Sequence, residues 1–124
     1  MENLRVVVTG ASAGIGRATA IEFGKLGARV ALLARGIEGL EGAKRDVERA
    51  GGTGLPIATD VADENAVEAA AERVEREWGG IDVWVNDAMA TVFSPFEKIS
   101  PDDFRREFEY LVESEPERLA IERM

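Results

Sequence analysis

The chain has 124 residues, of which 24 are acidic and 15 basic, and its formal charge at pH 7 is −9. It contains no Cys and no His, which excludes a disulfide framework, a thiolate nucleophile, an imidazole base and the metal sites that these side chains build. The acidic balance argues against a nucleic-acid partner, and no apolar run approaches the roughly 20 residues of a membrane-spanning helix. We therefore expect one soluble domain in the cytoplasm, without a metal.

Short apolar runs alternate with segments of helical spacing in the first half of the sequence. Residues 4–8 form a β-branched run typical of a strand that is buried on both faces, and residues 29–33 form another. Between them, apolar residues recur at helical intervals over 15–26, and Gly27 is placed to end that helix. A second helix is expected over 37–50. Three glycines fall near its start: Gly36, Gly39 and Gly42. Each costs about 1 kcal/mol of helix stability relative to Ala.

The same alternation continues to residue 85. A weaker strand over Thr53–Ala58 contains Pro56, which is easiest to place at the edge of a sheet. Asp63 opens a helix that runs to Trp78, and residues 81–85 form a fourth strand. Three strand–helix units followed by a strand predict an α/β fold. We expect a doubly wound, Rossmann-like parallel sheet of four strands in the order 3-2-1-4, with helices on both faces.

Helix start signals mark the last quarter of the chain. After a long loop over 87–99, a Ser-Pro-Asp-Asp sequence predicts a helix over 101–112. A Ser and a Glu at the spacing of a capping box then predict a short final helix over 115–124. Because the sequence contains no repeat and no low-complexity segment, we expect residues 1–124 to form a single domain.

A glycine-rich segment connects the first predicted strand to the first helix. Glycine lets the backbone turn tightly and approach a diphosphate, and the start of the helix offers N–H groups and the positive end of its dipole. This position inside a β–α–β unit is the context that a dinucleotide-binding loop requires. The candidate binding residues are Gly10, Ser12, Ala13, Gly14, Ile15 and Gly16. A purely structural turn is the alternative interpretation.

Arg35 ends the second strand, where a site for NAD would place an acidic residue to bind the ribose 2′-hydroxyl. A guanidinium suits the 2′-phosphate of NADP instead, because it presents a planar fork of donors. Ser12 could donate a further hydrogen bond there. The alternative for Arg35 is an ordinary solvated surface charge. The predicted cofactor is NADP.

Polar residues also end the third and fourth strands. Asp60, followed by Val61, lies where a carboxylate could accept a hydrogen bond from the adenine amino group. Its alternative role is to cap the helix that starts near Asp63. Asn86 is expected near the ribose of the nicotinamide, and a structural role in bridging the strand ends is the alternative.

At these residues the chain resembles the short-chain dehydrogenase/reductase family. The similar motifs, in order, are TGASAGIG at 9–16, Ala34-Arg35, Asp60-Val61, Asn86-Asp87-Ala88-Met89 and PFEKISPDDFRREFE at 95–109. The resemblance implies an NADP-binding Rossmann fold in which Ala88 also lies at the cofactor. For a full-length member it implies hydride transfer between a nicotinamide and a carbonyl or alcohol.

The sequence departs from the family at two places. Where the family has Asn-Asn-Ala-Gly, Asp87 adds a negative charge and Met89 adds bulk, so cofactor affinity should fall. The catalytic Ser, Tyr and Lys of the family lie on segments that this sequence does not contain. Tyr110 is the only tyrosine, and Ser114 stands where the family's Tyr-x-x-x-Lys requires Lys. We therefore predict no catalytic residue.

The resemblance predicts an NADP(H)-binding half-domain, the cofactor half of an oxidoreductase, that is inactive on its own. One alternative is a truncated or engineered scaffold that self-associates and binds no cofactor. Another is an oxidoreductase that works only with groups supplied by a partner. The fourth strand would be an open edge, covered either by the C-terminal helices or by a second copy. We expect a homodimer through this edge and those helices.

Overall fold

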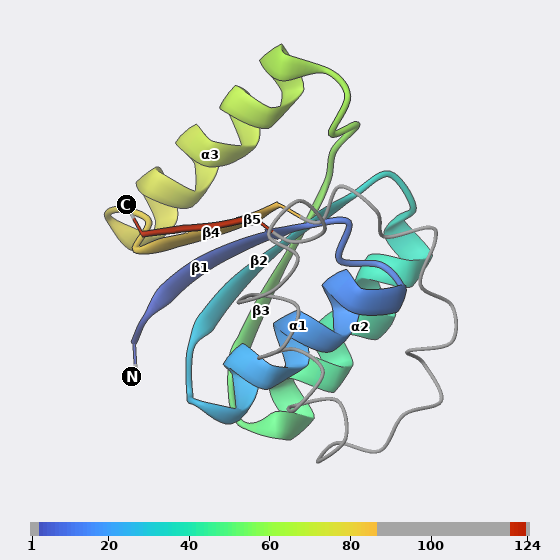
Figure 1. Ribbon diagram of the computed structural model, residues 1–124, viewed down its shortest axis with the longest axis vertical. Helices are drawn as coiled ribbons and strands as arrows, with labels where there is room; N and C mark the ends of the chain where they lie inside the picture. Colours follow the sequence, from blue (N-terminus) through green and yellow to red (C-terminus); the bar gives the residue numbers. More distant parts are fainter. Residues whose placement is uncertain (1–2, 87–119, 124) are drawn as a thin grey trace.

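The computed structural model describes residues 3–86 and 120–123. Its elements in chain order are β1 (Arg5–Thr9), α1 (Gly14–Lys25), β2 (Arg29–Ala34), α2 (Ile37–Ala50), β3 (Thr53–Ala58), α3 (Glu64–Trp78), β4 (Val83–Asn86) and β5 (Ala120–Arg123). Strands β1 to β4 are parallel and lie in the order β3-β2-β1-β4, which confirms the predicted sheet. α1 and α2 lie on one face and α3 on the other (Figure 1), so the sheet is doubly wound as expected.

The helices end where the capping residues of the sequence place them. α3 begins after Asp63, whose Oδ1 accepts hydrogen bonds from the backbone N–H groups of Asn65 at 3.0 Å and Ala66 at 3.3 Å. α2 and α3 each end at a glycine in the left-handed region, Gly51 with φ 116° and Gly79 with φ 82°. Left-handed backbone costs glycine almost nothing, so these glycines stop the helices cleanly.

Alternating side chains of the central strands fill two apolar layers, one on each face of the sheet. Val6 and Val8 of β1 belong to the layer beneath α1 and α2, whereas Val7 belongs to the layer beneath α3. The layer beneath α3 consists of Val7, Ala31, Leu33, Ile57, Ala70 and Val74. This burial on both faces explains why the central strands are continuous apolar runs in the sequence.

β5 stands where a helix was predicted. The capping-box pattern predicted a helix over 115–124, but Ala120–Arg123 is a strand that pairs antiparallel with β4. The helix prediction is therefore wrong for these residues. The edge of β4 carries N–H and C=O groups that need partners, and a strand ladder satisfies them where a local capping signal cannot. In the described part of the chain, β5 takes the place on β4 that was expected for C-terminal helices or a second copy.

The opposite edge of the sheet is β3. Pro56 lies on this strand, which confirms its predicted edge position, since proline cannot donate to a second neighbour. The predicted loop over 87–99 and helix over 101–112 fall outside the described residues. Within the described ranges, no helix has the length and apolar character needed to cross a membrane.

Candidate functional site

The connection from β1 into α1 has two glycines in the left-handed region, Gly10 in the loop with φ 65° and Gly14, the first residue of α1, with φ 59°. A side chain at either position would be strained, because left-handed backbone brings a Cβ too close to the following carbonyl. The N–H of Ala11 donates to the carbonyl of Leu33 at 3.2 Å, which ties the loop to β2. The glycines are thus required by the path of the backbone.

The first turn of α1 lies against this loop without a side-chain cap. Ala13 precedes the helix, and its methyl group accepts no hydrogen bond. α3 starts at the same edge of the sheet but is capped by Asp63. Because no acidic residue stands in the first turn of α1, the positive end of its dipole is available to an anionic ligand.

Few side chains of the glycine-rich loop are accessible to a ligand, so a ligand would contact mainly its backbone. Ala13 is exposed and Ser12 is half-buried, whereas Gly14, Ile15 and Gly16 are buried. The Ile15 side chain is among the largest that are fully buried, and it anchors the start of α1 in the core. A ligand at this loop would therefore meet N–H groups and the exposed side of Ser12 and Ala13.

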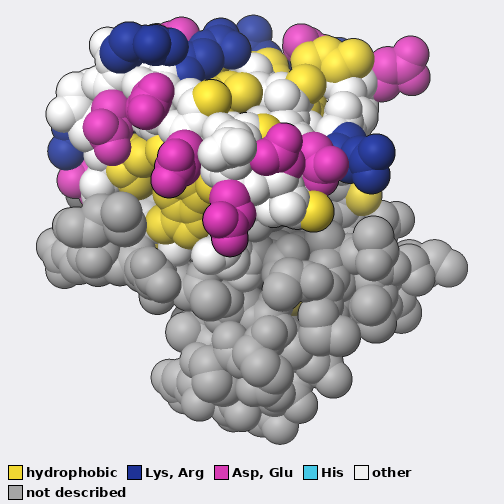
Figure 2. Space-filling model, turned by 90° about the horizontal axis from the view of Figure 1, so that it is seen from above, with side chains coloured by type: hydrophobic (Ala, Val, Ile, Leu, Met, Phe, Trp, Pro, Cys, Tyr) yellow, Lys and Arg dark blue, Asp and Glu magenta, His cyan; other side chains and the backbone are white. Residues whose placement is uncertain are grey.

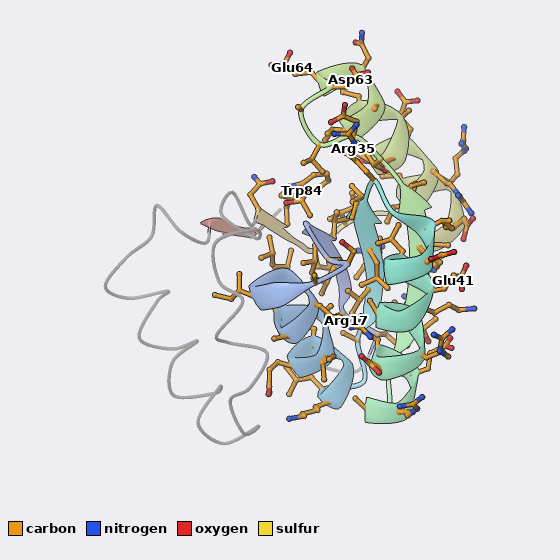
Figure 3. All side chains as sticks on the ribbon, turned by 90° about the vertical axis from the view of Figure 1, so that its right-hand side faces the viewer. Arg17, Arg35, Glu41, Asp63, Glu64 and Trp84 are labelled. Carbon is orange, nitrogen blue, oxygen red and sulfur yellow. The ribbon has the colours of Figure 1, made fainter. Side chains whose placement is uncertain are left out.

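Arg35 follows β2 directly and is exposed. Figure 3 shows it at the end of β2, in the region between α2 and α3. Beside it, the N–H of Thr59 donates to the carbonyl of Ala34 at 2.7 Å, which holds the ends of β2 and β3 together. Among the described residues, no hydrogen bond or ion pair engages the Arg35 guanidinium. Its donors are therefore available to a phosphate.

Asp60 shapes the turn between β3 and α3. Its Oδ1 accepts a hydrogen bond from the N–H of Ala62 at 3.0 Å, and its carbonyl accepts one from the N–H of Asp63 at 3.0 Å. The cap of α3 itself is Asp63, so Asp60 organises the turn before it. Val61 is 46% exposed and presents an apolar side chain at this edge of the sheet.

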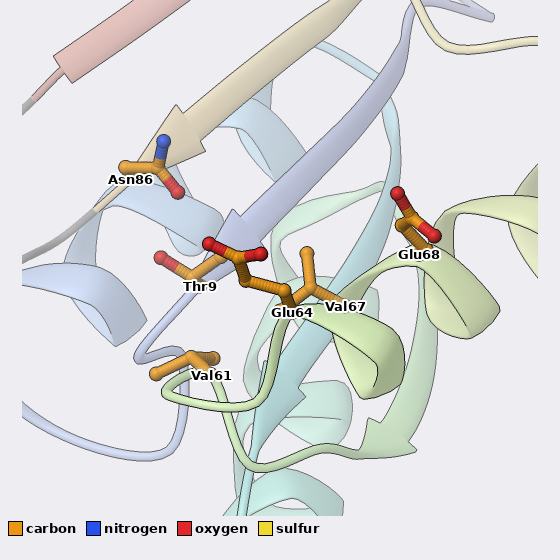
Figure 4. A pocket seen from close by; sticks show the side chains of 6 residues that line it. All are labelled: Thr9, Val61, Glu64, Val67, Glu68 and Asn86. Carbon is orange, nitrogen blue, oxygen red and sulfur yellow. The ribbon is translucent and has the colours of Figure 1, made fainter.

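A pocket of about 320 Å³ lies at the carboxyl ends of β1 and β4, beside the start of α3 (Figure 4). Its lining residues are Thr9, Val61, Glu64, Val67, Glu68 and Asn86. The pocket brings together two of the predicted site residues, Val61 and Asn86. The glycine-rich loop and Arg35 do not line it, so they form separate parts of the same edge of the sheet.

Sequence reasoning missed four of the residues that line the pocket. Glu64, Val67 and Glu68 have the i, i+3, i+4 spacing that puts side chains on one helix face, so their grouping was visible in the sequence. The packing of α3 decides that this face meets the sheet edge. Thr9 is buried, and its hydroxyl donates to the carbonyl of Val85 at 3.4 Å, which joins the ends of β1 and β4.

Asn86 is held in one orientation by Trp84. Its Oδ1 accepts a hydrogen bond from Nε1 of Trp84 at 2.8 Å. The indole N–H can only donate, so the amide oxygen must face Trp84 and the NH₂ group must face away from it. The two residues stand two positions apart on β4 and therefore share one face of the strand. Asn86 thus has its two N–H donors free of this bond.

Carboxylates surround the pocket. Glu64 and Glu68 line it, and Asp60 and Asp63 are exposed in the turn before α3. Figure 2 views the molecule from the side of α3 and shows acidic side chains spread over that face. Carboxylates repel phosphate and accept hydrogen bonds from amino groups, so the pocket suits a neutral ring that carries donors. Arg35 and the start of α1 suit anions.

Several predicted positions lie in the part of the chain that the structure does not describe. They are the binding residue Ala88, the departures Asp87 and Met89, and Tyr110 with Ser114.

Comparison with known proteins places these features in a family. Residues 4–114 match the family of short chain dehydrogenases. Hydroxysteroid dehydrogenase-like protein 2 of Xenopus tropicalis is 40% identical over 104 residues, which cover 74% of this chain and 25% of that protein. 3beta-hydroxysteroid dehydrogenase 1 of Eggerthella lenta is 38% identical over 104 residues, which cover 82% of this chain and 39% of that protein. The chain thus spans well under half the length of these relatives.

Solved structures show the same similarity. A short chain dehydrogenase of Mycobacterium thermoresistibile matches with a TM-score of 0.68 at 34% identity. The match covers 85% of this chain and 40% of the dehydrogenase chain. A metagenomic short-chain oxidoreductase in complex with NADP has a TM-score of 0.64 at 42% identity, over 67% of this chain and 37% of its own. NAD+-bound xylitol dehydrogenase has a TM-score of 0.62 at 36% identity, over 65% of this chain and 31% of its own.

Proposed function

The chain belongs to the short-chain dehydrogenase family, and from this premise we propose that it binds NADP(H) as the cofactor half of an oxidoreductase. The observation that carries the proposal is the start of α1, which has left-handed glycines at Gly10 in the preceding loop and at Gly14, its first residue, and has no side-chain cap. The other helix that starts at this edge and has a side-chain cap, α3, uses the carboxylate of Asp63. A diphosphate at the loop would lie at the positive end of the α1 dipole, as the carboxylate of Asp63 does at the start of α3.

Arg35 supports NADP(H) over NAD(H). Its guanidinium is exposed, immediately follows β2, and has no partner among the residues that the structure describes. The 2′-phosphate distinguishes the two cofactors, and a bidentate guanidinium is well suited to bind it. Among the solved relatives, one holds NADP and another holds NAD+, so the family alone does not decide the choice.

The pocket beside α3 suits the adenine and ribose end of the cofactor. Val61 offers an apolar surface to a ring, and the carboxylates of Glu64 and Glu68 repel phosphate but accept hydrogen bonds from an amino group. Asp60 is predicted to accept from the adenine amino group with the oxygen that does not serve the turn. Asn86, at the end of β4, is proposed to donate to a hydroxyl of the nicotinamide ribose, because its amide oxygen is occupied by Trp84.

When bound, the nicotinamide supplies hydride transfer. The 124 residues hold and orient the cofactor, but they contain no Tyr-x-x-x-Lys pair, since Ser114 follows the only tyrosine at that spacing. Hydride transfer to a carbonyl also needs a proton from a group whose pKa matches the reaction. We therefore propose that these residues bind NADP(H) without reducing a substrate, unless a partner supplies the missing groups.

A cofactor titration tests this proposal. We expect saturable binding that is tighter for NADPH than for NADH when heat is measured by calorimetry. Arg35→Glu should weaken NADPH binding by about 10-fold to 100-fold, because charge-assisted hydrogen bonds contribute about 1.5–3 kcal/mol. It should not weaken NADH binding, because a carboxylate there can accept a hydrogen bond from the ribose 2′-hydroxyl. The absence of saturable binding at millimolar cofactor would contradict the proposal and favour the scaffold alternative.

The cytoplasmic location and the homodimer also belong to the proposal. β5 is the outer strand beside β4, so a dimer through this edge would pair β5 with its copy. The mass in solution, measured by light scattering over a range of concentrations, tests the dimer. A monomer at all concentrations would contradict it.

A further inference from the structure

Arg17 links three parts of the molecule at the far side of the glycine-rich loop. It lies in the first turn of α1, and Figure 3 shows it between α1 and α2. Its Nε and Nη2 donate to Oδ2 of Asp46 on α2 at 2.9 and 2.7 Å. Its Nη1 donates to the backbone carbonyl of Ser12 in the loop at 3.3 Å. One guanidinium therefore connects the loop, the start of α1 and the middle of α2.

Two glycines of α2 make this contact sterically feasible. A Cβ at Gly42 would lie 3.0 Å from Nη2 of Arg17, and a Cβ at Gly39 would lie 2.9 Å from the Cβ of Ser12. Larger residues at these positions would press against the guanidinium and the loop. The cost of glycine within a helix is thus offset by a close approach of α2 to the loop.

α2 begins almost directly after Arg35. Arg35 is followed by Gly36, the N-terminal cap residue of α2, so the start of this helix immediately follows the residue proposed to bind the 2′-phosphate. The carboxylate of Asp46 is further held by Arg49, whose Nη1 lies 3.7 Å from Oδ1. A change in the contact between Arg17 and Asp46 would therefore shift the loop relative to Arg35.

We infer that Arg17 is a positioning residue, and that its bridge between Ser12 and Asp46 sets the spacing between the diphosphate loop and Arg35. This inference rests on the proposed function, because it names the residues that hold the two phosphate-binding parts in register. We do not expect Arg17 to contact a phosphate. It acts by holding the Ser12 carbonyl in the loop and Asp46 on α2. Binding and selectivity for NADPH should then depend on Asp46, which lies 29 positions from Arg17 in the sequence.

A matched control exists at the other end of the sheet. Arg5 and Asp82 form an ion pair with two side-chain hydrogen bonds of 3.0 Å each, and their side chains are 27% and 35% exposed against 32% and 28% for Arg17 and Asp46. Hydrogen bonding from Arg5 to Asp82, together with the charge of Asp82, raises the pKa of Arg5. This pair joins the start of β1 to the residue before β4, far from the loop.

The experiment compares Asp46→Asn with Asp82→Asn. For Asp46→Asn we expect NADPH binding to weaken about tenfold, within the range that mutations in coupling networks produce, and the NADPH to NADH affinity ratio to fall. Asp82→Asn should lower the midpoint of urea unfolding about as much as Asp46→Asn does. It should change neither the NADPH affinity nor the NADPH to NADH affinity ratio. Equal effects of the two variants on cofactor affinity and on selectivity would overturn the inference.

Amide hydrogen exchange without cofactor gives a second readout. The N–H of Ala11 is buried and bonded to Leu33, so its protection reports whether the loop is held closed. Arg17→Lys keeps a charge for Asp46, but one ammonium cannot replace the fork that also reaches Ser12. We expect this variant to fold and to speed exchange at Ala11, but not at Thr53, whose N–H donates to Ala28 at the opposite end of the sheet.

The two readouts separate failure of the inference from failure of the proposed function. If the unmodified protein binds no NADPH, the proposed function is wrong, and exchange at Ala11 alone decides whether Arg17 holds the loop. If NADPH binds but neither exchange nor selectivity responds to Arg17→Lys or Asp46→Asn, the positioning role is wrong while the proposed function stands.

Discussion

The hydrogen bond from Trp84 to Asn86 determines what the end of β4 can offer a ligand. Without it the amide could rotate and present either its oxygen or its NH₂ group to the pocket. At 2.8 Å the indole N–H occupies the oxygen, so Asn86 is set as a donor. The chemistry of this residue therefore depends on a neighbour two positions away, which was not identified as a site residue from the sequence.

Trp84→Phe tests this orientation while keeping an aromatic ring in the apolar layer. We expect NADPH binding to weaken about threefold to tenfold, because the lost hydrogen bond contributes about 1 kcal/mol, and calorimetry measures the change. Trp78→Phe is the control, since Trp78 packs against the same layer and its ring lies 5.7 Å from the guanidinium carbon of Arg29. Equal affinities for the Trp84 variant and the unmodified protein would show that Asn86 needs no such orientation.

The three described helices all begin at one edge of the sheet, but they differ in how the backbone N–H groups of their first turns are capped. Asp63 serves two N–H groups at the start of α3, whereas α1 begins after Ala13 and has no such side chain. A helix start without a side-chain cap lowers the stability of the folded protein. A bound ligand can offset this loss by accepting hydrogen bonds from the backbone N–H groups there. α2 also lacks a side-chain cap but has Glu38 in its first turn, so α1 is the one described helix with neither a side-chain cap nor an acidic residue there.

Asp63→Ala should destabilise the protein by about 1 kcal/mol, the usual cost of losing an N-terminal cap. Urea unfolding measures the loss. Glu72→Ala, an exposed change on the same helix, is the control and should have little effect. If both variants unfold at the same urea concentration as the unmodified protein, the hydrogen bonds of Asp63 contribute nothing to the stability of α3.

The whole molecule has one half of a doubly wound sheet closed by a short antiparallel strand. β4 would otherwise expose an unpaired edge next to the apolar side chain of Val85. β5 pairs with all four residues of β4, so within the described ranges the outer strand on this side has only four residues. β5 therefore keeps the β4 edge from pairing with other chains, and the proposed dimer would form through the short outer strand.

Removal of β5 should therefore promote association. Replacing residues 120–124 by Gly and Ser leaves the chain length unchanged but removes the strand-forming Ile121 and adds glycine, which weakens strands. We expect this variant to form species larger than a dimer at concentrations where the unmodified protein does not, as measured by light scattering. Identical masses for the two proteins across the concentration range would show that β5 does not protect β4.

Much of the fold could be predicted because its signals are local or periodic. The apolar runs, the glycines at helix ends and the acid before α3 each act on neighbouring backbone, so the strands and helices up to residue 86 followed from them. Their alternation indicated a doubly wound sheet, for which the order β3-β2-β1-β4 was expected. The glycine-rich loop was equally visible, since Gly10 and Gly14 are required by the backbone conformation at those two residues.

The rest depends on contacts between distant segments. A capping box is a local preference, and it did not predict that residues 120–123 would meet an open edge at β4. The glycines of α2 had no explanation until Ser12 and Arg17 were seen against them. By itself the sequence determined which segments are strands and helices up to residue 86 and where a backbone loop can hold an anion. Only the tertiary structure decided which side chains support that loop and which strand closes the sheet, because packing and edge pairing join residues that periodicity cannot connect.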